Sequence, residues 1–417
     1  MINISRKLFF LVAACLPINL GYHFIVKEAY AGGLLIDYLI PTLFIQDLLV
    51  LALIISWSLS SSFKEDWKKI ITFPQVVLAI WFVFAMLLSV FESGRTLPSL
   101  VFFARTALYV LFMFYTATNF NFDRDFGLLT KIFTVSVFLL GLLGVAQYLH
   151  QGSIFDNYLV FGEQPYDSRI VSIAKENVFG YTKIPAYGLF RHPNIFGGIL
   201  SILLIWIFQK YLQTRSKSLL FVFLTGIFAL VVTFSYLSWA SLVIGIILVF
   251  SKQHGKKAAM LFVIAILVAG FLMPSVRNKL VNENPSVYRR INLLNASYKI
   301  ISSEVLFGVG INNSIVALEK NIPWSKDIRF VQPVHNIFVL VLLEMGLVGF
   351  LLFVLILGYV FLQMWQNNSF LYIALLQIIF LGSFDHYFVT IHQPWLLLWL
   401  IIGMCASLGS VSKTSRF

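Results

Sequence analysis

The chain has 417 residues, of which 59% are hydrophobic and only 12% are charged. Soluble domains carry about 25% charged residues, so the composition excludes a soluble domain with one anchor and indicates a protein embedded in a membrane along its length. The net charge of +12 would suggest nucleic acid in a soluble protein. Membrane proteins collect lysine and arginine on cytoplasmic loops, so no nucleic-acid partner is expected.

Apolar runs long enough to cross a bilayer predict an all-α polytopic fold with about 12 transmembrane helices, forming one integral membrane domain over residues 1–417. The stretch 217–250 is nearly continuous and fits one span or two. We expect spans near 8–26, 34–56, 73–91, 99–118, 127–149, 192–209, 217–233, 235–250, 257–274, 335–363, 369–388 and 392–410.

The distribution of basic residues predicts the orientation. If Met1 is inside, the short inner segments hold most of the lysines and arginines, and the short outer segments hold little beyond Lys27 and Arg95. This asymmetry predicts that both termini are cytoplasmic. Two long loops, 150–191 and 275–334, then lie outside, and their basic residues either meet solvent or bind phosphate.

Cysteine and acidic residues give little support for a metal. Cys15 and Cys405 lie in predicted spans, so no disulfide framework is implied. Cys15 also follows Leu11-Val-Ala-Ala, which is compatible with a lipoprotein cleavage box or with a first span. The first outer loop, 27–33, has one glutamate and no Asp-x-Asp, so a metal site and other cofactors are not expected.

The loop 275–334 contains a predicted amphipathic helix. Asn284-Pro285 is typical of a helix start, and Arg289 and Arg290 lie off the centre of the apolar face that follows. The alternative is a helix on the membrane surface whose arginines contact lipid headgroups. The spacing of three and four that marks the apolar face involves Val287, Ile291, Leu294, Tyr298, Ile301 and Val305.

Charged residues inside predicted spans either carry function or pair to hold a bundle together. We expect Asp47 and Arg105 to pair. Glu344 lies roughly 13 Å below His335 along a helix and is expected to set helix packing beside Gly346.

Several short motifs together resemble the core signature of the O-antigen ligase and polymerase superfamily. They are Arg290, Gly308-Val-Gly310, Pro333-Val-His335-Asn336-Ile-Phe and Glu344-Met-Gly346-Leu-Val-Gly349, preceded by Tyr187-Gly-Leu-Phe-Arg191-His-Pro193-Asn194 and Thr233-Phe-Ser235 and followed by Asp385-His386-Tyr387 and Gln393. The resemblance covers residues 180–410 and rests on the order and spacing of the motifs.

The resemblance implies an inverting, metal-independent membrane glycosyltransferase with an extracytoplasmic helical cap formed by the 275–334 loop. Such an enzyme transfers a glycan from an undecaprenyl-pyrophosphate carrier to a glycan, glycolipid or protein acceptor, on the outer face of the bacterial cytoplasmic membrane. Membrane lipids surround such an enzyme. Ligase and polymerase remain equally compatible with the motifs.

The resemblance also assigns site residues. The family histidine corresponds to His335, the general base, and the loop arginine corresponds to Arg290, or to Arg289 if the register slips by one. The second family arginine corresponds to Arg191, with Lys183 as the other candidate. Asn336, Asp385 and His386 are further candidates for substrate contacts, and His392 flanks the same outer turn. Tyr236 and Val305 depart from the family pattern, which carries arginine and proline there.

Elementary chemistry favours the same roles. Arginine forks pair bidentately with pyrophosphate oxygens, and a histidine with a near-neutral pKa is a common general base. The alternative is that His335 has only a structural role and makes a hydrogen bond at the start of a helix. A transporter or lipid flippase is the rival class, but matching broken helices in two halves, which inverted repeats would have, are not apparent in the sequence. A polymerase with an acidic catalytic loop is disfavoured because the acidic residues of 275–334 are scattered.

Overall fold

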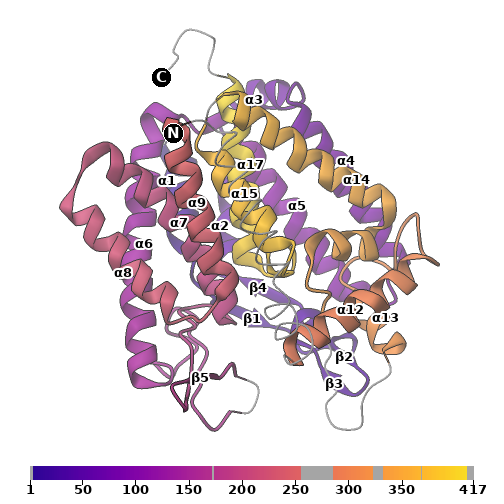
Figure 1. The fold of residues 1–417 in the computed structure, drawn as a ribbon. Coiled ribbons are helices and arrows are strands. Elements are labelled where there is room, and N and C mark those ends of the chain that lie inside the picture. Colours follow the sequence, from indigo (N-terminus) through magenta and orange to yellow (C-terminus); the bar gives the residue numbers. More distant parts are fainter. Residues whose placement is uncertain (1–2, 171–172, 255–284, 323–331, 368, 411–417) are drawn as a thin grey trace.

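A computed structural model describes residues 3–170, 173–254, 285–322, 332–367 and 369–410 (Figure 1). Most of the described chain is helical, as predicted. The helices are α1 Asn3–Cys15, α2 Ile45–Ser58, α3 Phe63–Ile70, α4 Pro74–Glu92, α5 Thr96–Asn119, α6 Phe122–His150, α7 Pro193–Thr214, α8 Lys217–Val231, α9 Tyr236–His254, α12 Pro285–Ile301, α13 Ser314–Asn321, α14 Ile337–Gln366, α15 Leu371–Gly382, α16 Tyr387–Thr390 and α17 His392–Ser410.

Short strands form three separate two-stranded antiparallel sheets. The strands β1 to β3, two 3-10 turns, α12, α13 and β5 lie at one end of the bundle, whereas α1 begins and α17 ends at the opposite end (Figure 1). The pairs are β1 Gly21–His23 with β4 Thr42–Phe44, β2 Tyr30–Ala31 with β3 Leu34–Leu35, and β5 Glu176–Val178 with β6 Tyr181–Lys183, and the 3-10 turns are η1 Lys27–Ala29 and η2 Asp37–Leu39.

Five helices of the described chain, α4, α5, α6, α7 and α14, are long and apolar enough to cross a membrane. The pair α2 and α3, bent by 107°, makes a sixth candidate, and α8, α9, α15 and α17 are shorter apolar helices. The membrane-embedded character is therefore confirmed, but the described residues do not contain twelve full-length spans. The predicted span 257–274 lies outside the described residues.

The first two predicted spans are partly wrong. Helix α1 ends at Cys15, and the chain then forms β1, whereas the prediction continued a helix to residue 26. Helix α2 begins at Ile45, eleven residues after the predicted start at 34. Pro17 cannot continue a helix, and the apolar residues that follow are used in strand pairing between β1 and β4. Hydrophobicity alone does not separate such strands from a span.

The core of the bundle is formed around α17, which packs against α5, α14 and α15. Trp395 and Trp399 are each 1% exposed. The predicted pair of buried charges is confirmed: Arg105 Nε lies 3.2 Å from Asp47 Oδ2, and Tyr109 donates a hydrogen bond of 2.9 Å to Asp47 Oδ1. A buried carboxylate with these partners avoids the cost of an unpaired charge.

The helix α12 forms where the sequence predicts one, and its buried face matches the predicted stripe in part. Leu294 and Ile301 of the stripe are half-buried and pack against the core. Tyr298 is 54% exposed, and Val305, 47% exposed, lies beyond the end of the helix. The fully buried side of α12 is shifted by about one residue, because Ala296 packs closely there although a small residue contributes little to an apolar stripe. The residues on that side are Leu293, Ala296 and Ile300, which pack with Leu318 of α13 and Leu343 of α14.

Helix α14 is interrupted at Gly346, whose φ of 62° and ψ of −166° are accessible essentially only to glycine. A loop that follows α12 supplies the backbone hydrogen bonds at this break. Val309 N donates to Leu343 O at 2.9 Å, Gly310 N to Glu344 O at 3.1 Å, and Leu347 N to Val305 O at 2.8 Å. We refer to residues 305–310 together with Leu343–Leu347 as the backbone clasp.

Glu344 holds the clasp from the side. Its Oε1 accepts hydrogen bonds from Ser314 Oγ at 2.7 Å and from Ser314 N at 3.3 Å, and its carbonyl accepts one from Ser89 Oγ at 2.8 Å. The buried glutamate therefore joins α14 to α13 and α4, which agrees with a role in packing.

Replacing Gly346 by alanine tests the clasp. An added Cβ would lie 2.2 Å from Leu306 O, at a backbone conformation that alanine avoids. Strain and overpacking together should lower the free energy of unfolding by about 3 kcal/mol, measured by thermal unfolding in detergent. Gly358→Ala on the same helix is the control, because nothing lies within 4 Å of its added Cβ. Equal stability of both variants would show that the clasp is not under steric constraint.

Candidate active site

Three separate segments bring two imidazoles, a carboxylate and a guanidinium together. His335 lies two residues before α14, Asp385 and His386 lie in the turn between α15 and α17, and Arg290 projects from α12. Ligand atoms of His335, Asp385 and His386 all lie within 4.8 Å of one another. Arg290 Nη2 is 4.0 Å from Asp385 Oδ2, and Nη1 is 3.5 Å from the Phe384 carbonyl. We call these four residues the outer cluster.

Asn336 joins two sides of the outer cluster. Its Oδ1 accepts hydrogen bonds from Phe338 N at 2.9 Å and Val339 N at 3.1 Å, which caps the start of α14. Its Nδ2 donates to the Ser383 carbonyl at 2.9 Å. Both the acceptor and the donor side of this amide are therefore used within the protein, and the contacts hold His335 against the turn that carries Asp385.

The carboxylate and the second imidazole have neighbours of their own. Asp385 Oδ1 accepts a hydrogen bond of 2.8 Å from His386 N, and Asn194 Nδ2 lies 3.5 Å from Asp385 Oδ2. His386 Nδ1 is 2.7 Å from Thr390 Oγ1, and its ring contacts that of His335 edge to face at a centroid distance of 4.9 Å. His386 is thus fixed between two partners.

Electrostatics keep both imidazoles uncharged at neutral pH. Burial lowers the pKa of His335 to about 4 and that of His386 to about 3, against the opposing effect of Asp385. Burial would raise the pKa of Asp385, but its imidazole neighbours, Arg290 and the His386 N–H together lower it below its usual range. Since the imidazoles are neutral, Arg290 and the N–H are the causes that operate near pH 7, and Asp385 is an anion there.

Three of these groups could in principle ligate a metal ion, since their donor atoms are close enough. The guanidinium of Arg290, which lies beside the carboxylate, opposes it, whereas the contact of His386 Nδ1 with Thr390 leaves Nε2 toward Asp385 and does not. A fixed positive charge at that distance repels a cation. The donor set therefore fits an ion poorly.

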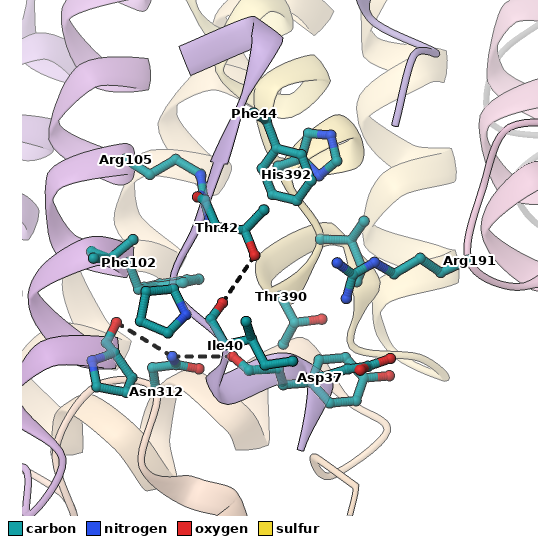
Figure 2. Close-up of a pocket in the computed structure, with 15 residues that line it drawn as sticks. Asp37, Ile40, Thr42, Phe44, Phe102, Arg105, Arg191, Asn312, Thr390 and His392 are labelled. Carbon is teal, nitrogen blue, oxygen red and sulfur yellow. Dashed lines mark hydrogen bonds between the residues drawn. The ribbon is translucent and has the colours of Figure 1, made fainter. Parts of the chain in front are cut away.

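A small cavity of about 40 Å³ adjoins the outer cluster, with Arg191 on its wall (Figure 2). Thr390 and Tyr38 line this cavity and also contact His386, the latter at a ring distance of 5.3 Å. Arg105 lines it too, but its charge is already met by Asp47. The other lining residues named in Figure 2 are Asp37, Ile40, Thr42, Phe44, Phe102, Asn312 and His392.

Arg191 is positioned differently from Arg105. Its Nη2 lies 3.4 Å from His23 Nε2, and its buried Nε has no hydrogen-bond partner among the described residues. Lys183 ends strand β6, paired with Glu176, and does not line this cavity. Arg289 is next to Arg290 on α12, so the two side chains leave the helix about 100° apart around its axis. The structure thus places Arg290 in the outer cluster and Arg191 on the wall of the adjoining cavity.

Three residues that complete the site were not predicted from the sequence. Asn194 was part of a quoted motif without a role, and Tyr38 and Thr390 were not named as candidates. Asn194 follows the N-cap of α7, where His192 Nδ1 accepts its backbone N–H at 3.1 Å. A polar residue beside a helix start at the outer end is a usable signal, whereas the placement of Tyr38 depends on β1 to β4 and has no local signal.

Comparison with known proteins finds one family. Residues 219–354 match a family model described as O-antigen ligase. The match includes Arg290, the backbone clasp and His335, and ends before Asp385. No curated protein matches the chain. The match covers about a third of the chain and, together with the apolar membrane-length helices, supports a place in the O-antigen ligase superfamily of membrane proteins.

Proposed function

We propose that the protein transfers a glycan from an undecaprenyl-pyrophosphate carrier to a hydroxyl of a glycan, glycolipid or protein acceptor, with inversion at the anomeric carbon. One observation carries the proposal. Arg191 Nε, Arg290 Nε and His335 Nδ1 are buried nitrogens without hydrogen-bond partners among the described residues, and all belong to the same outer region. Buried polar atoms are nearly always satisfied, so this set favours an anionic ligand and a proton to be accepted.

The two arginines supply the recognition of the pyrophosphate. Each guanidinium is permanently charged and can pair with two oxygens at once. Arg290 is partly buried, with 30% of its side chain exposed. A charge-assisted hydrogen bond made there is stronger than the same bond made in water. Charge that develops on the departing lipid pyrophosphate would meet these groups.

His335 acts as the general base in the proposed reaction. The acceptor oxygen attacks the anomeric carbon while its proton passes to the imidazole, and the bond from that carbon to the pyrophosphate oxygen breaks. The electron pair leaves with the lipid pyrophosphate. A single displacement inverts the configuration. Asp385 stabilises the imidazolium that forms, and His386 and Asn336 orient the site.

The orientation follows from the loop charges and the arrangement of the bundle. Helix α12, which carries Arg290, lies at the end of the bundle opposite to the start of α1 and the end of α17 (Figure 1). Cytoplasmic termini would therefore place the outer cluster on the outer face of the cytoplasmic membrane, where lipid-linked glycans are presented.

The decisive test supplies purified protein with a polyprenyl-pyrophosphate glycan and candidate acceptors. We expect glycan transfer, with inverted anomeric configuration in the product, both in buffer and in excess EDTA. A flippase would move the donor across proteoliposomes without forming a product. Movement without transfer would favour the flippase, and loss of transfer in EDTA would contradict metal independence.

Arg290→Ala should lower transfer at least about a hundredfold, because one transition-state contact to developing charge typically contributes that much. Arg290→Lys should recover only part of it, since a point charge cannot replace the fork. Arg191→Ala should show a loss of the same kind. Arg289→Ala, its neighbour on α12, is the matched control and should lose far less; unchanged turnover in Arg290→Ala would remove the pyrophosphate role.

His335→Ala should lower turnover about 10²- to 10⁴-fold, the usual contribution of a general base, while donor binding weakens little. The pH profile separates this role from a structural one. The midpoint of the acid limb of kcat/KM should lie below pH 6.5, because burial lowers the pKa of His335. The midpoint of the acid limb of kcat should lie at higher pH, since bound pyrophosphate favours the imidazolium.

The charged neighbours of His335 set the direction in which that profile should move. Beyond burial, which lowers the pKa of His335, Asp385 raises it and Arg290 and His192 lower it. Arg290→Lys should therefore leave the acid limb nearly in place, whereas Asp385→Asn should move it to lower pH. If the acid limb stays at the same pH in Asp385→Asn, His335 is not the titrating base.

A further inference from the structure

A second and larger cavity, of about 540 Å³, lies between the end of α6 and the hairpin β5–β6. Its volume is within the range of pockets that hold small ligands, about 300–1,000 Å³. The family match does not include it. Polar and apolar groups line it in about equal measure, and the polar ones include Gln151, Asp156, Ser168, Lys175 and Thr182 near the ring of Tyr166. We call it the loop pocket.

The wall of the loop pocket is built on a fully buried carboxylate. Glu163 is 0% exposed. Its Oε1 accepts hydrogen bonds from Ile154 N at 2.9 Å and Gln147 Nε2 at 2.6 Å, and its Oε2 accepts one from Phe155 N at 2.6 Å. A wall fixed in this way is preorganised, because its backbone donors are satisfied inside the protein.

Two lining residues have left-handed backbone conformations, Gln151 with φ of 61° and Asp156 with φ of 50°. Such conformations cost free energy in residues other than glycine and concentrate at ligand sites. Asp156 is exposed, and its Oδ1 lies 3.3 Å from Ser153 Oγ. The strained turn therefore presents a carboxylate beside a hydroxyl on the pocket wall.

The charges of the loop pocket largely cancel. Asp167, on its wall, pairs with Arg169, and the ammonium of Lys175, which donates to the Ser168 carbonyl at 2.9 Å, is opposite in sign to the carboxylate of Asp156. The lining then offers one carboxylate, one ammonium, an amide, hydroxyls and an aromatic ring. This set suits a neutral ligand with many hydroxyl groups better than a phosphate or a cation.

The loop pocket shares its scaffold with the candidate active site. The rings of Tyr166 and Tyr187 lie 4.6 Å apart, and those of Tyr187 and His192 lie 6.2 Å apart. Gln147, which holds Glu163, also accepts from Gly188 N at 2.7 Å and donates to Gly188 O at 2.9 Å. One hydrogen-bonded unit thus fixes both the pocket wall and the turn that leads to Arg191.

From this geometry we infer that the loop pocket binds a sugar residue of a glycan chain, away from the bond being formed. The inference rests on the proposed glycan transfer and deepens it. Asp156, Gln151 and Thr182 would bind sugar hydroxyls, and the scaffold shared with Arg191 would hold the chain in register with the outer cluster. The sugar belongs either to the glycan on the donor or to the acceptor.

The test uses the full chain in detergent and, as probe, the oligosaccharide released by mild acid from the lipid-linked glycan of its own cells. Saturation-transfer NMR and titration measure binding. Thr182→Trp and Ser168→Trp, both at exposed positions, should fill the pocket and weaken binding at least about tenfold, as a bulky ring excludes the ligand. Tyr181→Trp is the matched control, on the opposite face of the same strand, and should bind as the unaltered protein does.

Transfer kinetics then identify the source of the sugar. A raised KM for the lipid-linked donor in Thr182→Trp assigns the pocket to the donor glycan, and a raised KM for the acceptor assigns it to the acceptor. Arg290→Ala should lose transfer and keep oligosaccharide binding. Absence of binding in the unaltered protein, or equal binding in Thr182→Trp, overturns the inference even if transfer occurs. Binding that depends on Thr182 in a protein without transfer supports the pocket and refutes the proposed function.

Discussion

The backbone clasp is the constraint on which the outer region depends. A helix that breaks inside an apolar bundle leaves peptide groups without partners, at a cost of several kcal/mol each where water is absent. Here the loop 305–310 supplies those partners to α14 at Gly346. The same loop directly follows α12. The position of Arg290 relative to His335 is therefore set by hydrogen bonds made about two helical turns below the site.

The clasp also explains why glycines and an acidic residue recur in the motifs. Gly308 and Gly310 have φ of 70° and 94°, and a Cβ on Gly308 would lie 2.5 Å from Leu343 O. Glu344 satisfies the start of α13 through Ser314. These residues are conformational and hydrogen-bonding requirements of the clasp, whereas His335, two residues before α14, has no such obligation at Nδ1. Structural and chemical parts of one motif can thus be separated by asking which atoms are already satisfied.

Much of the fold could be predicted from the sequence, and the errors have physical causes. Long uninterrupted apolar runs located α4 to α7 and α14 closely, because only a span needs such a run. The outer strands β1 to β4 were missed because apolar residues at an outer edge suit a strand pair as well as a span. The buried face of α12 was partly misplaced because Leu293 and Ile300 pack against α14 on the side that also carries Ala296. That small residue contributes little to a hydrophobic pattern. The residues Asp385 and His386 were found from motif order, but their contact with His335 depends on the Asn336–Ser383 hydrogen bond, which no local pattern encodes.

The electrostatic design of the site follows from where these groups sit. A histidine in water at pH 7 is partly protonated and a mediocre acceptor, and burial beside a guanidinium removes that proton. The cost is a weaker base in the empty site. In the proposed reaction, an arriving pyrophosphate would offset that cost, because its negative charge would neutralise Arg290 and raise the proton affinity of the imidazole. Base strength would then rise only when donor is bound, so the acceptor hydroxyl would be activated in the presence of a leaving group and water would be a poor substitute.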